Sequence, residues 1–223
     1  MQISGEFMSS IDTPVEPKTI EKRSFEIIES EVSEPRAFSG NEWLVVRRMV
    51  HTTADFELLS LVRFHPDAIQ AGVKALREGC LIVTDTEMAR MGIPMRRMQP
   101  LGCQVTCYIN DPAVIENAQK EKITRASAAV DHALSRLDGG ICVVGNAPTA
   151  LLKLLSLIKK GKCKPALIVG MPVGFVNAAE SKEMLMEQSE IPYITIKGRK
   201  GGSALAACVI NQLAEIVLER SEK

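Results

Sequence analysis

His51 is the residue whose type and position best suit acid–base chemistry. It ends a predicted helix that opens near residue 41 and runs through the segment EWLVVRRMVH, and Asp55 follows four residues later. A histidine titrates near neutral pH, so it can both donate and accept a proton. Spacing alone favours a structural histidine that hydrogen-bonds a backbone carbonyl or Asp55. His65, which precedes a proline, and His132, inside an amphipathic segment, have weaker claims.

Four loops that follow apolar, β-rich segments carry residues suited to binding a polar ligand. They are the segments at 85–88 (DTEM), 146–151 (NAPTAL), 171–176 (MPVGFV) and 198–203 (GRKGGS). Ligands of open parallel sheets bind outside the carboxyl ends of the strands. Glycines let backbone N–H groups approach a ligand, and helix N-termini favour anions. The loops therefore predict a pocket rim for an anionic ligand, although such turns also occur for turn geometry alone.

The sequence lacks the common motifs of nucleotide binding and hydrolysis. It has no GxxxxGK[ST], GxGxxG, GxSxG or HExxH. This argues against ATP, NAD and a hydrolytic triad, and it favours a capping or ligand-contacting role for Ser203. The six cysteines include no CxxC pair, and several lie in apolar runs. They are predicted to be reduced core residues rather than a disulfide framework or a zinc site.

The order of the predicted elements indicates an α/β fold. Short apolar strands are predicted at 80–84, 103–109, 141–145, 166–170 and 192–196. Helices are predicted at 17–33, 41–51, 55–63, 65–77, 122–136, 148–160, 178–188 and 202–219. Continuous apolar strands that alternate with amphipathic helices are typical of a parallel sheet covered on both faces. We expect a three-layer α/β/α fold with about five mainly parallel strands, flavodoxin-like, preceded by N-terminal helices.

Composition limits the remaining possibilities. The chain has 223 residues, is 46% hydrophobic, and its 27 basic and 27 acidic residues give a net charge of zero. This predicts a single domain over residues 17–223 without the basic footprint of a nucleic-acid binder. No apolar run approaches the roughly 20 residues that span a bilayer. Residues 1–16 do not resemble a signal peptide and are predicted to be a disordered leader or residues left by cloning. A cytoplasmic location is expected.

Six segments resemble the precorrin-8X and cobalt-precorrin-8 methylmutase family. They are SFEII (24–28), VRRMVHTTAD (46–55), TDTEMARMGI (84–93), GNAPTALLKL (145–154), GMPVGFVNAAESKE (170–183) and GRKGGSALAA (198–207). The likeness covers about residues 17 to 217 in order, and the NAPTAL and GMPVGFVNAAESKE segments together are highly specific. One departure is Ala54, where many relatives place glycine.

The resemblance implies an isomerase of cobalamin biosynthesis. In this family a methyl group moves from C-11 to C-12 of the macrocycle, giving hydrogenobyrinate, or cobyrinate when cobalt is present. It implies no cofactor, no metal held by the protein, and a homodimer. The family's proton donor or acceptor corresponds to His51. A non-catalytic corrinoid carrier remains an alternative, an unusual nucleotide-binding protein a weaker one, and the metal state of the natural substrate stays open.

A corrinoid is a broad apolar disc with carboxylates on its rim, so its site should combine an apolar floor with distributed donors. Met88, Val173 and Phe175 are predicted to supply the floor. By family likeness, Ser24 and Arg125 match substrate-contacting positions. The other predicted substrate contacts are Arg48, Asp85, Pro148, Thr149, Gly174, Arg199, Gly202 and Ser203.

Overall fold

The structure, a computed structural model, describes residues 17–221. It divides into two compact units, one ending at Arg36 and the other beginning at Ala37, and each is described by itself. The first unit contains helix α1 (Pro17–Glu31), where a helix is predicted. The predicted leader, residues 1–16, lies outside the described residues, and the single domain stays a prediction.

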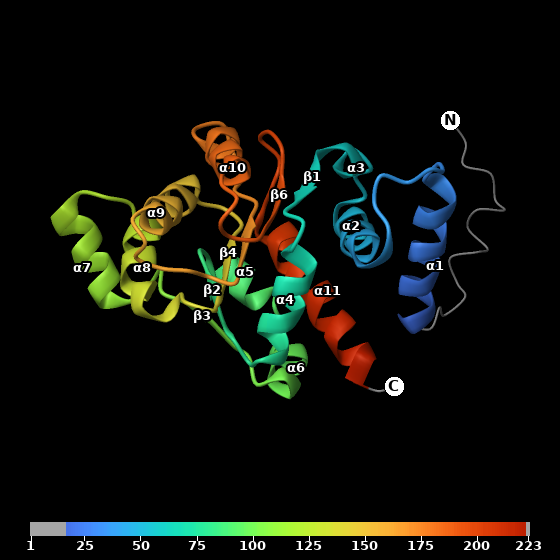
Figure 1. Cartoon of the computed structure of the whole chain (residues 1–223), viewed down its shortest axis with the longest axis horizontal. Helices are drawn as coiled ribbons and strands as arrows, with labels where there is room; N and C mark the ends of the chain where they lie inside the picture. Colours follow the sequence, from blue (N-terminus) through green and yellow to red (C-terminus); the bar gives the residue numbers. More distant parts are fainter. Residues whose placement is uncertain (1–16, 222–223) are drawn as a thin grey trace, which may run out of the picture. The chain divides into compact units, whose positions relative to one another are not determined.

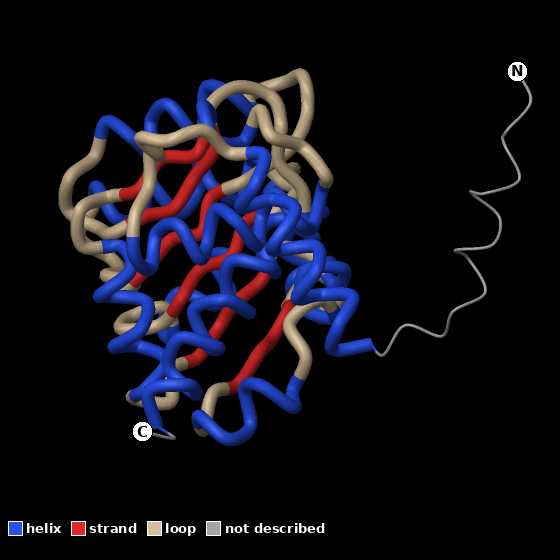
Figure 2. Tube along the Cα trace, turned by 90° about the vertical axis from the view of Figure 1, so that its right-hand side faces the viewer, coloured by secondary structure: helices blue, strands red, loops and turns tan. Residues whose placement is uncertain are grey.

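A six-stranded sheet forms the centre of the second unit (Figure 2). Its strands are β1 (Val62–Phe64), β2 (Leu81–Thr84), β3 (Gln104–Cys107), β4 (Ile141–Val144), β5 (Leu167–Gly170) and β6 (Tyr193–Ile196). They are ordered β1-β6-β5-β4-β2-β3, and all neighbours except β1 and β6 are parallel. Read from β3, the five parallel strands follow the flavodoxin order 2-1-3-4-5, which confirms the predicted fold class.

Helices cover both faces of the sheet. The helices of this unit are α2 (Gly40–Thr53), α3 (Leu58–Leu61), α4 (Ala68–Arg77), α5 (Glu87–Met91), α6 (Met95–Met98), α7 (Pro112–Glu121), α8 (Arg125–Ala133), α9 (Pro148–Lys159), α10 (Ala178–Glu187) and α11 (Ser203–Ser221). In Figure 1, α8, α9 and α10 lie on one side of the sheet, and α4 and α11 lie on the other. Every residue of β4, β5 and β6 is buried, which explains their mainly apolar sequence.

The predicted helix at 55–63 is wrong over its last part. Only Leu58–Leu61 is helical, and Val62–Phe64 forms the edge strand β1 instead. β1 pairs antiparallel with β6, with Val62 opposite Ile196. This pairing satisfies backbone groups at the edge of β6 and buries the β-branched Val62, which outweighs a local helical preference.

The direction of β1 determines which segment reaches the carboxyl ends of the parallel strands, where sheets of this kind bind ligands. Because β1 is antiparallel to β6, the start of β1 lies beside the carboxyl end of β6. The backbone N–H of Lys197 donates to the carbonyl of Leu61 at 2.9 Å and continues this alignment. The connection from α2 to β1 therefore arrives where the parallel strands end.

Two further findings concern the described part of the chain as a whole. Within residues 17–221, no helix combines the length and apolar character needed to cross a membrane. Four of the six cysteines are buried, and Cys80 and Cys107 are half-buried.

Candidate functional site

The neighbouring strands β2 and β4 meet at the point where the strand order reverses, which is where doubly wound sheets bind ligands. Asp85 directly follows β2. Its carboxylate accepts hydrogen bonds from the backbone N–H groups of Gly145 (2.9 Å), Asn146 (2.8 Å) and Ala147 (2.7 Å). Burial raises the pKa of the Asp85 carboxyl, and the three N–H donors oppose that rise. Asp85 thus fixes the loop that leads into α9.

The hydroxyls of Thr86 and Ser203 join the loop after β6 to the loops after β2 and β4. The side-chain oxygens of Thr86 and Ser203 lie 2.9 Å apart, and Thr86 also caps α5 by accepting the N–H of Ala89 at 3.1 Å. A Cβ on Gly145 would lie 2.6 Å from the Cα of Ser203. Glycine at 145 therefore permits the close approach of the loop after β4 to the start of α11.

The loops after β5 and β6 are also paired with each other. The N–H of Gly202 donates to the carbonyl of Met171 at 2.9 Å, and the N–H of Gly174 donates to the carbonyl of Arg199 at 3.2 Å. The guanidinium of Arg199 lies 5.4 Å from the centre of the Phe175 ring. The structure thus brings together the predicted contacts Gly174, Phe175, Arg199 and Gly202.

The residues predicted to form an apolar floor are exposed. Met88 is 73% exposed, Val173 42% and Phe175 82%. Their apolar side chains are therefore accessible to a ligand or partner. The candidate site is accordingly an open surface at the carboxyl ends of the strands, and it is lined by loops.

The N-termini of α8 and α9 form a second cluster of polar residues at the candidate site. The hydroxyls of Thr124 and Thr149 lie 2.8 Å apart, and Pro148 occupies the first turn of α9. Arg125 begins α8, and its guanidinium donates to the side-chain oxygen of Asn110 at 3.4 Å. Two helix N-termini and a guanidinium together favour an anionic group.

His51 lies on the last turn of α2 and is half-buried. The helix ends at Ala54, whose φ of 53° is left-handed and whose N–H donates to the carbonyl of Val50 at 2.7 Å. Lys200 of the loop after β6 binds the carboxylates of Asp55 at 2.5 Å and Glu57 at 2.6 Å. The end of the His51 helix is therefore attached to the loop that carries Arg199 and Gly202.

Two of the predicted substrate contacts, Arg48 and Ser24, lie in helices and not in these loops. Arg48 is buried, and its guanidinium donates to Gln212 at 2.9 Å and to Glu215 at 2.6 Å, so it joins α2 to α11. Ser24 lies in α1 of the first unit, and its hydroxyl donates to the carbonyl of Ile20 at 2.9 Å. Substrate contacts of these two residues stay predictions.

Sequence reasoning did not select Lys182, the largest of the fully buried side chains. Its ammonium donates to the carbonyl of Lys200 at 2.5 Å, and burial lowers its pKa to about 8. A lysine in an amphipathic helix is ordinarily a surface residue, so no local signal distinguishes it. The caps Thr86 and Thr124 could have been found, because each is a threonine just before a helical run.

Other features of the second unit lie apart from this edge. One hollow of about 480 Å³ is lined by residues such as Gly161 and Glu190, and another of about 590 Å³ by residues such as Pro66 and Arg77. Neither includes a predicted site residue. Between residues 17 and 221, no group of three or more His, Cys, Asp or Glu side chains is arranged to hold a metal ion.

Known proteins resemble this chain over most of its length. The precorrin-8X methylmutase family model matches residues 19–216. A cobalt-precorrin-8 methylmutase from Priestia megaterium is 46% identical over 200 residues, which cover 90% of this chain and 88% of that protein. A precorrin-8X methylmutase from Pseudomonas aeruginosa is 40% identical over 205 residues, covering 92% and 98% of the two chains. The crystal structure of a precorrin-8X methylmutase from Thermus thermophilus has a TM-score of 0.84 at 43% identity and covers 91% of this chain and 97% of that one.

Proposed function

This chain belongs to the precorrin-8X methylmutase family, isomerases of cobalamin biosynthesis, and we propose that it moves a methyl group from C-11 to C-12 of its corrinoid substrate. The product would be hydrogenobyrinate from precorrin-8X, or cobyrinate from cobalt-precorrin-8. Relatives carry both substrate names. The observation that carries the proposal is the single edge at which loops from β2, β4, β5 and β6 meet the end of the His51 helix.

The polar and apolar groups of this edge suit a polycarboxylate disc. Exposed Met88 and Phe175 offer apolar area for the face of the ring. Arg125, Arg199 and the start of α9 offer donors for carboxylates around its rim. Since Asp85 directs its carboxylate into backbone N–H groups, it shapes the rim without presenting a negative charge to an anionic substrate.

In the proposed reaction, His51 exchanges a proton with the macrocycle. A suprafacial methyl shift breaks one carbon–carbon bond and forms another on the same face, so it requires no nucleophile. Protonation of a ring nitrogen or conjugated position would lower the barrier, and a histidine can supply and recover that proton near neutral pH. The remaining residues would hold the ring so that its reacting edge faces His51.

Turnover distinguishes the isomerase from a carrier that only holds the product. Purified protein is incubated with a tenfold excess of precorrin-8X, and in parallel of cobalt-precorrin-8, and the visible spectrum is followed. Migration makes C-11 trigonal and C-12 tetrahedral, which alters the conjugated system, so an isomerase changes the spectrum of every equivalent. Conversion that stops at one equivalent, or binding without conversion, would contradict the proposal and favour the carrier.

The cytoplasmic location and the homodimer are further parts of the proposal and rest on likeness to the family. Their direct tests are fractionation of the native host and the molar mass of the purified protein in solution. A monomer with full turnover would remove the homodimer from the proposal without affecting the reaction.

A further inference from the structure

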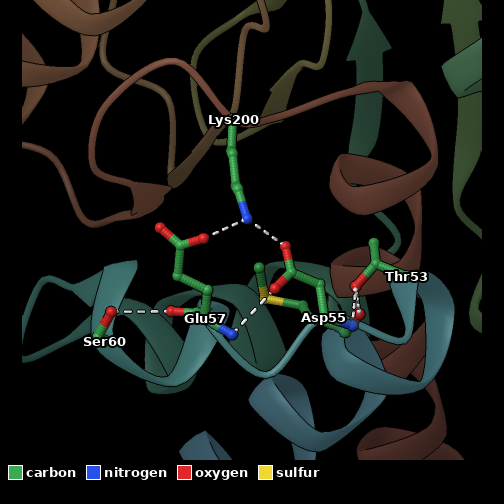
Figure 3. Close-up of polar contacts among 6 residues, drawn as sticks. Thr53, Asp55, Glu57, Ser60 and Lys200 are labelled. Atoms are coloured by element: carbon green, nitrogen blue, oxygen red, sulfur yellow. Dashed lines mark hydrogen bonds and ion pairs between the residues drawn. The ribbon is translucent and has the colours of Figure 1, made fainter.

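Lys200 connects two segments that are far apart in the sequence. Its ammonium lies 2.5 Å from Oδ2 of Asp55 and 2.6 Å from Oε2 of Glu57, as Figure 3 shows. We call these three residues the Lys200 cluster. Asp55 and Glu57 follow directly after α2, whose last turn carries His51. The hydrogen bonds to Lys200 lower the pKa of Asp55, and those to Asp55 and Glu57 raise the pKa of Lys200.

The backbone of Lys200 is held independently of its side chain. The buried ammonium of Lys182 donates to the carbonyl of Lys200 at 2.5 Å. On either side, the carbonyl of Arg199 accepts the N–H of Gly174, and the N–H of Gly202 donates to the carbonyl of Met171. A Cβ on Gly201 would lie 2.2 Å from the carbonyl oxygen of Met171, so the loop also packs tightly. The backbone that carries the Lys200 side chain is therefore held in place.

The carboxylate side of the cluster is equally well defined. Oδ1 of Asp55 accepts the N–H of Glu57 at 2.9 Å, while the N–H of Asp55 is 3.3 Å from the hydroxyl of Thr53. The hydroxyl of Ser60 donates to the carbonyl of Glu57 at 2.9 Å (Figure 3). Hydrogen bonds within the turn from Thr53 to Ser60 thus connect Asp55 to its neighbours, and movement of Asp55 would be passed to the last turn of α2.

The exposure of the cluster argues against stability as its main contribution. The side chains of Lys200, Asp55 and Glu57 are 43%, 32% and 58% exposed. Ion pairs this open to water add little to folding stability. The cluster can instead contribute by fixing the position of a catalytic group, because a displacement of about 1 Å between such a group and its substrate can cost roughly a hundredfold in rate.

We propose that Lys200 is a positioning residue, which holds the end of α2 against the glycine-rich loop after β6 and so sets the place of His51 relative to the bound ring. The inference rests on the proposed role of His51 in proton exchange. Lys200 acts here through Asp55 and Glu57 and does not itself contact the substrate.

The main test is Lys200→Met, which keeps most of the side-chain volume and removes the charge. We expect kcat to fall about ten- to a hundredfold, with KM changed by less than about twofold and an unchanged melting temperature. Lys74→Met is the matched control, since Lys74 also pairs with a carboxylate, Glu78, at 3.9 Å. Lys74 lies on α4, which leads into the start of β2 at the opposite edge of the sheet, and its variant should keep the wild-type kcat.

A double-mutant cycle tests the route of the effect. The pair Asp55→Asn and Glu57→Gln should lower kcat about as much as Lys200→Met, and combining all three substitutions should add little further loss. Additive losses would overturn the proposal. A raised KM with unchanged kcat for Lys200→Met would also overturn it, because that result indicates a direct bond from Lys200 to a substrate carboxylate.

Hydrogen exchange of the free protein separates this inference from the proposed reaction. Lys200→Met should speed amide exchange in residues 50–57, because the turn after α2 loses its attachment. Residues 198–203 should keep the wild-type rate, because Lys182, Gly174 and Met171 hold the backbone of that loop. Lys74→Met should change neither segment. This readout needs no turnover, so it still decides the inference if wild-type protein fails to convert the substrate. Unchanged exchange in residues 50–57 contradicts the positioning role even where the wild-type protein is active.

Discussion

Oδ1 of Asp85 lies 2.9 Å from the backbone nitrogen of Gly145, which joins the ends of two neighbouring strands, β2 and β4. The other carboxylate oxygen accepts the next two N–H groups of the same loop. The Asp85 side chain, which follows β2, therefore supplies the hydrogen-bond acceptor for the backbone N–H groups that follow β4. The geometry of the loop before α9 depends on this one carboxylate.

Asp85→Ala is expected to lower the free energy of unfolding by about 2 to 5 kcal/mol, since three backbone N–H groups lose their acceptor and one of them is fully buried. Urea unfolding measures the loss. Asp138→Ala is the control, because Asp138 accepts a single exposed N–H, from Lys164, and should lose about 1 kcal/mol or less. Equal losses in the two variants would show that the Asp85 loop has other support.

His51→Ala is expected to lower kcat at least about a hundredfold while the affinity for the corrinoid product changes little, because the substitution removes proton exchange and not the ring contacts. Single-turnover absorbance gives the rate, and fluorescence quenching of the protein by product gives the affinity. His132→Ala serves as control, since His132 lies in the last turn of α8, far along that helix from Arg125. A His51→Ala variant with the wild-type rate would remove His51 from the mechanism.

Ala54→Gly is expected to raise the free energy of unfolding by about 1 kcal/mol. Ala54 has a φ of 53°, a left-handed conformation that is unfavourable for residues with a Cβ and that glycine adopts freely. The same substitution at Ala71, inside α4, should lower stability by about 1 kcal/mol. Both are measured by urea unfolding, and changes of the same sign in the two variants would contradict this explanation.

Lys182 should give stability a specific dependence on pH. Burial lowers its pKa from 10.5 to about 8, so between these values the unfolded chain binds a proton that the folded chain has released. The free energy of unfolding therefore rises with pH across this window, by at most about 3 kcal/mol relative to Lys182→Met. Unfolding of both proteins from pH 7 to 10.5 isolates the effect, because other groups titrate alike in both. Parallel curves would mean that Lys182 keeps its ordinary pKa.

Phe175→Ala and Arg199→Gln are each expected to raise the Kd for the corrinoid product several-fold without changing the melting temperature, since the Phe175 ring is 82% exposed. The double variant should lose less than the sum of the two, because Arg199 lies over the Phe175 ring at 5.4 Å. Met184→Ala, which removes a 49% exposed side chain from α10, is the control for loss of apolar surface. Unchanged binding in both single variants would remove the loop pair from the site.

The parallel part of the fold could be predicted from sequence because its signals are local. The runs that form β2, β4, β5 and β6 are mainly apolar, and Pro148 marks the start of α9. β1 could not be predicted, since three residues show no period and become a strand only by pairing with Ile194–Ile196. The same holds for Lys182 and for the partners of Arg48, whose surroundings come from helices distant in the sequence. The loops after the strand ends lie together, as the sequence predicted, and their binding of a ligand stays a prediction. The sequence did not show which partners their polar groups have.

The shortness of β1 makes the edge of the sheet sensitive to its pairing register. Only three residue pairs align β1 with β6. A slip of two residues would keep the same side chains facing the core and would shift the preceding segment by about 7 Å. Such a slip would draw His51 along the sheet and separate Asp55 from Lys200. Insertions or deletions between Thr53 and Val62 should therefore be tolerated less well than equally exposed changes in other loops, because the length of this connection sets the position of His51 relative to the loop after β6.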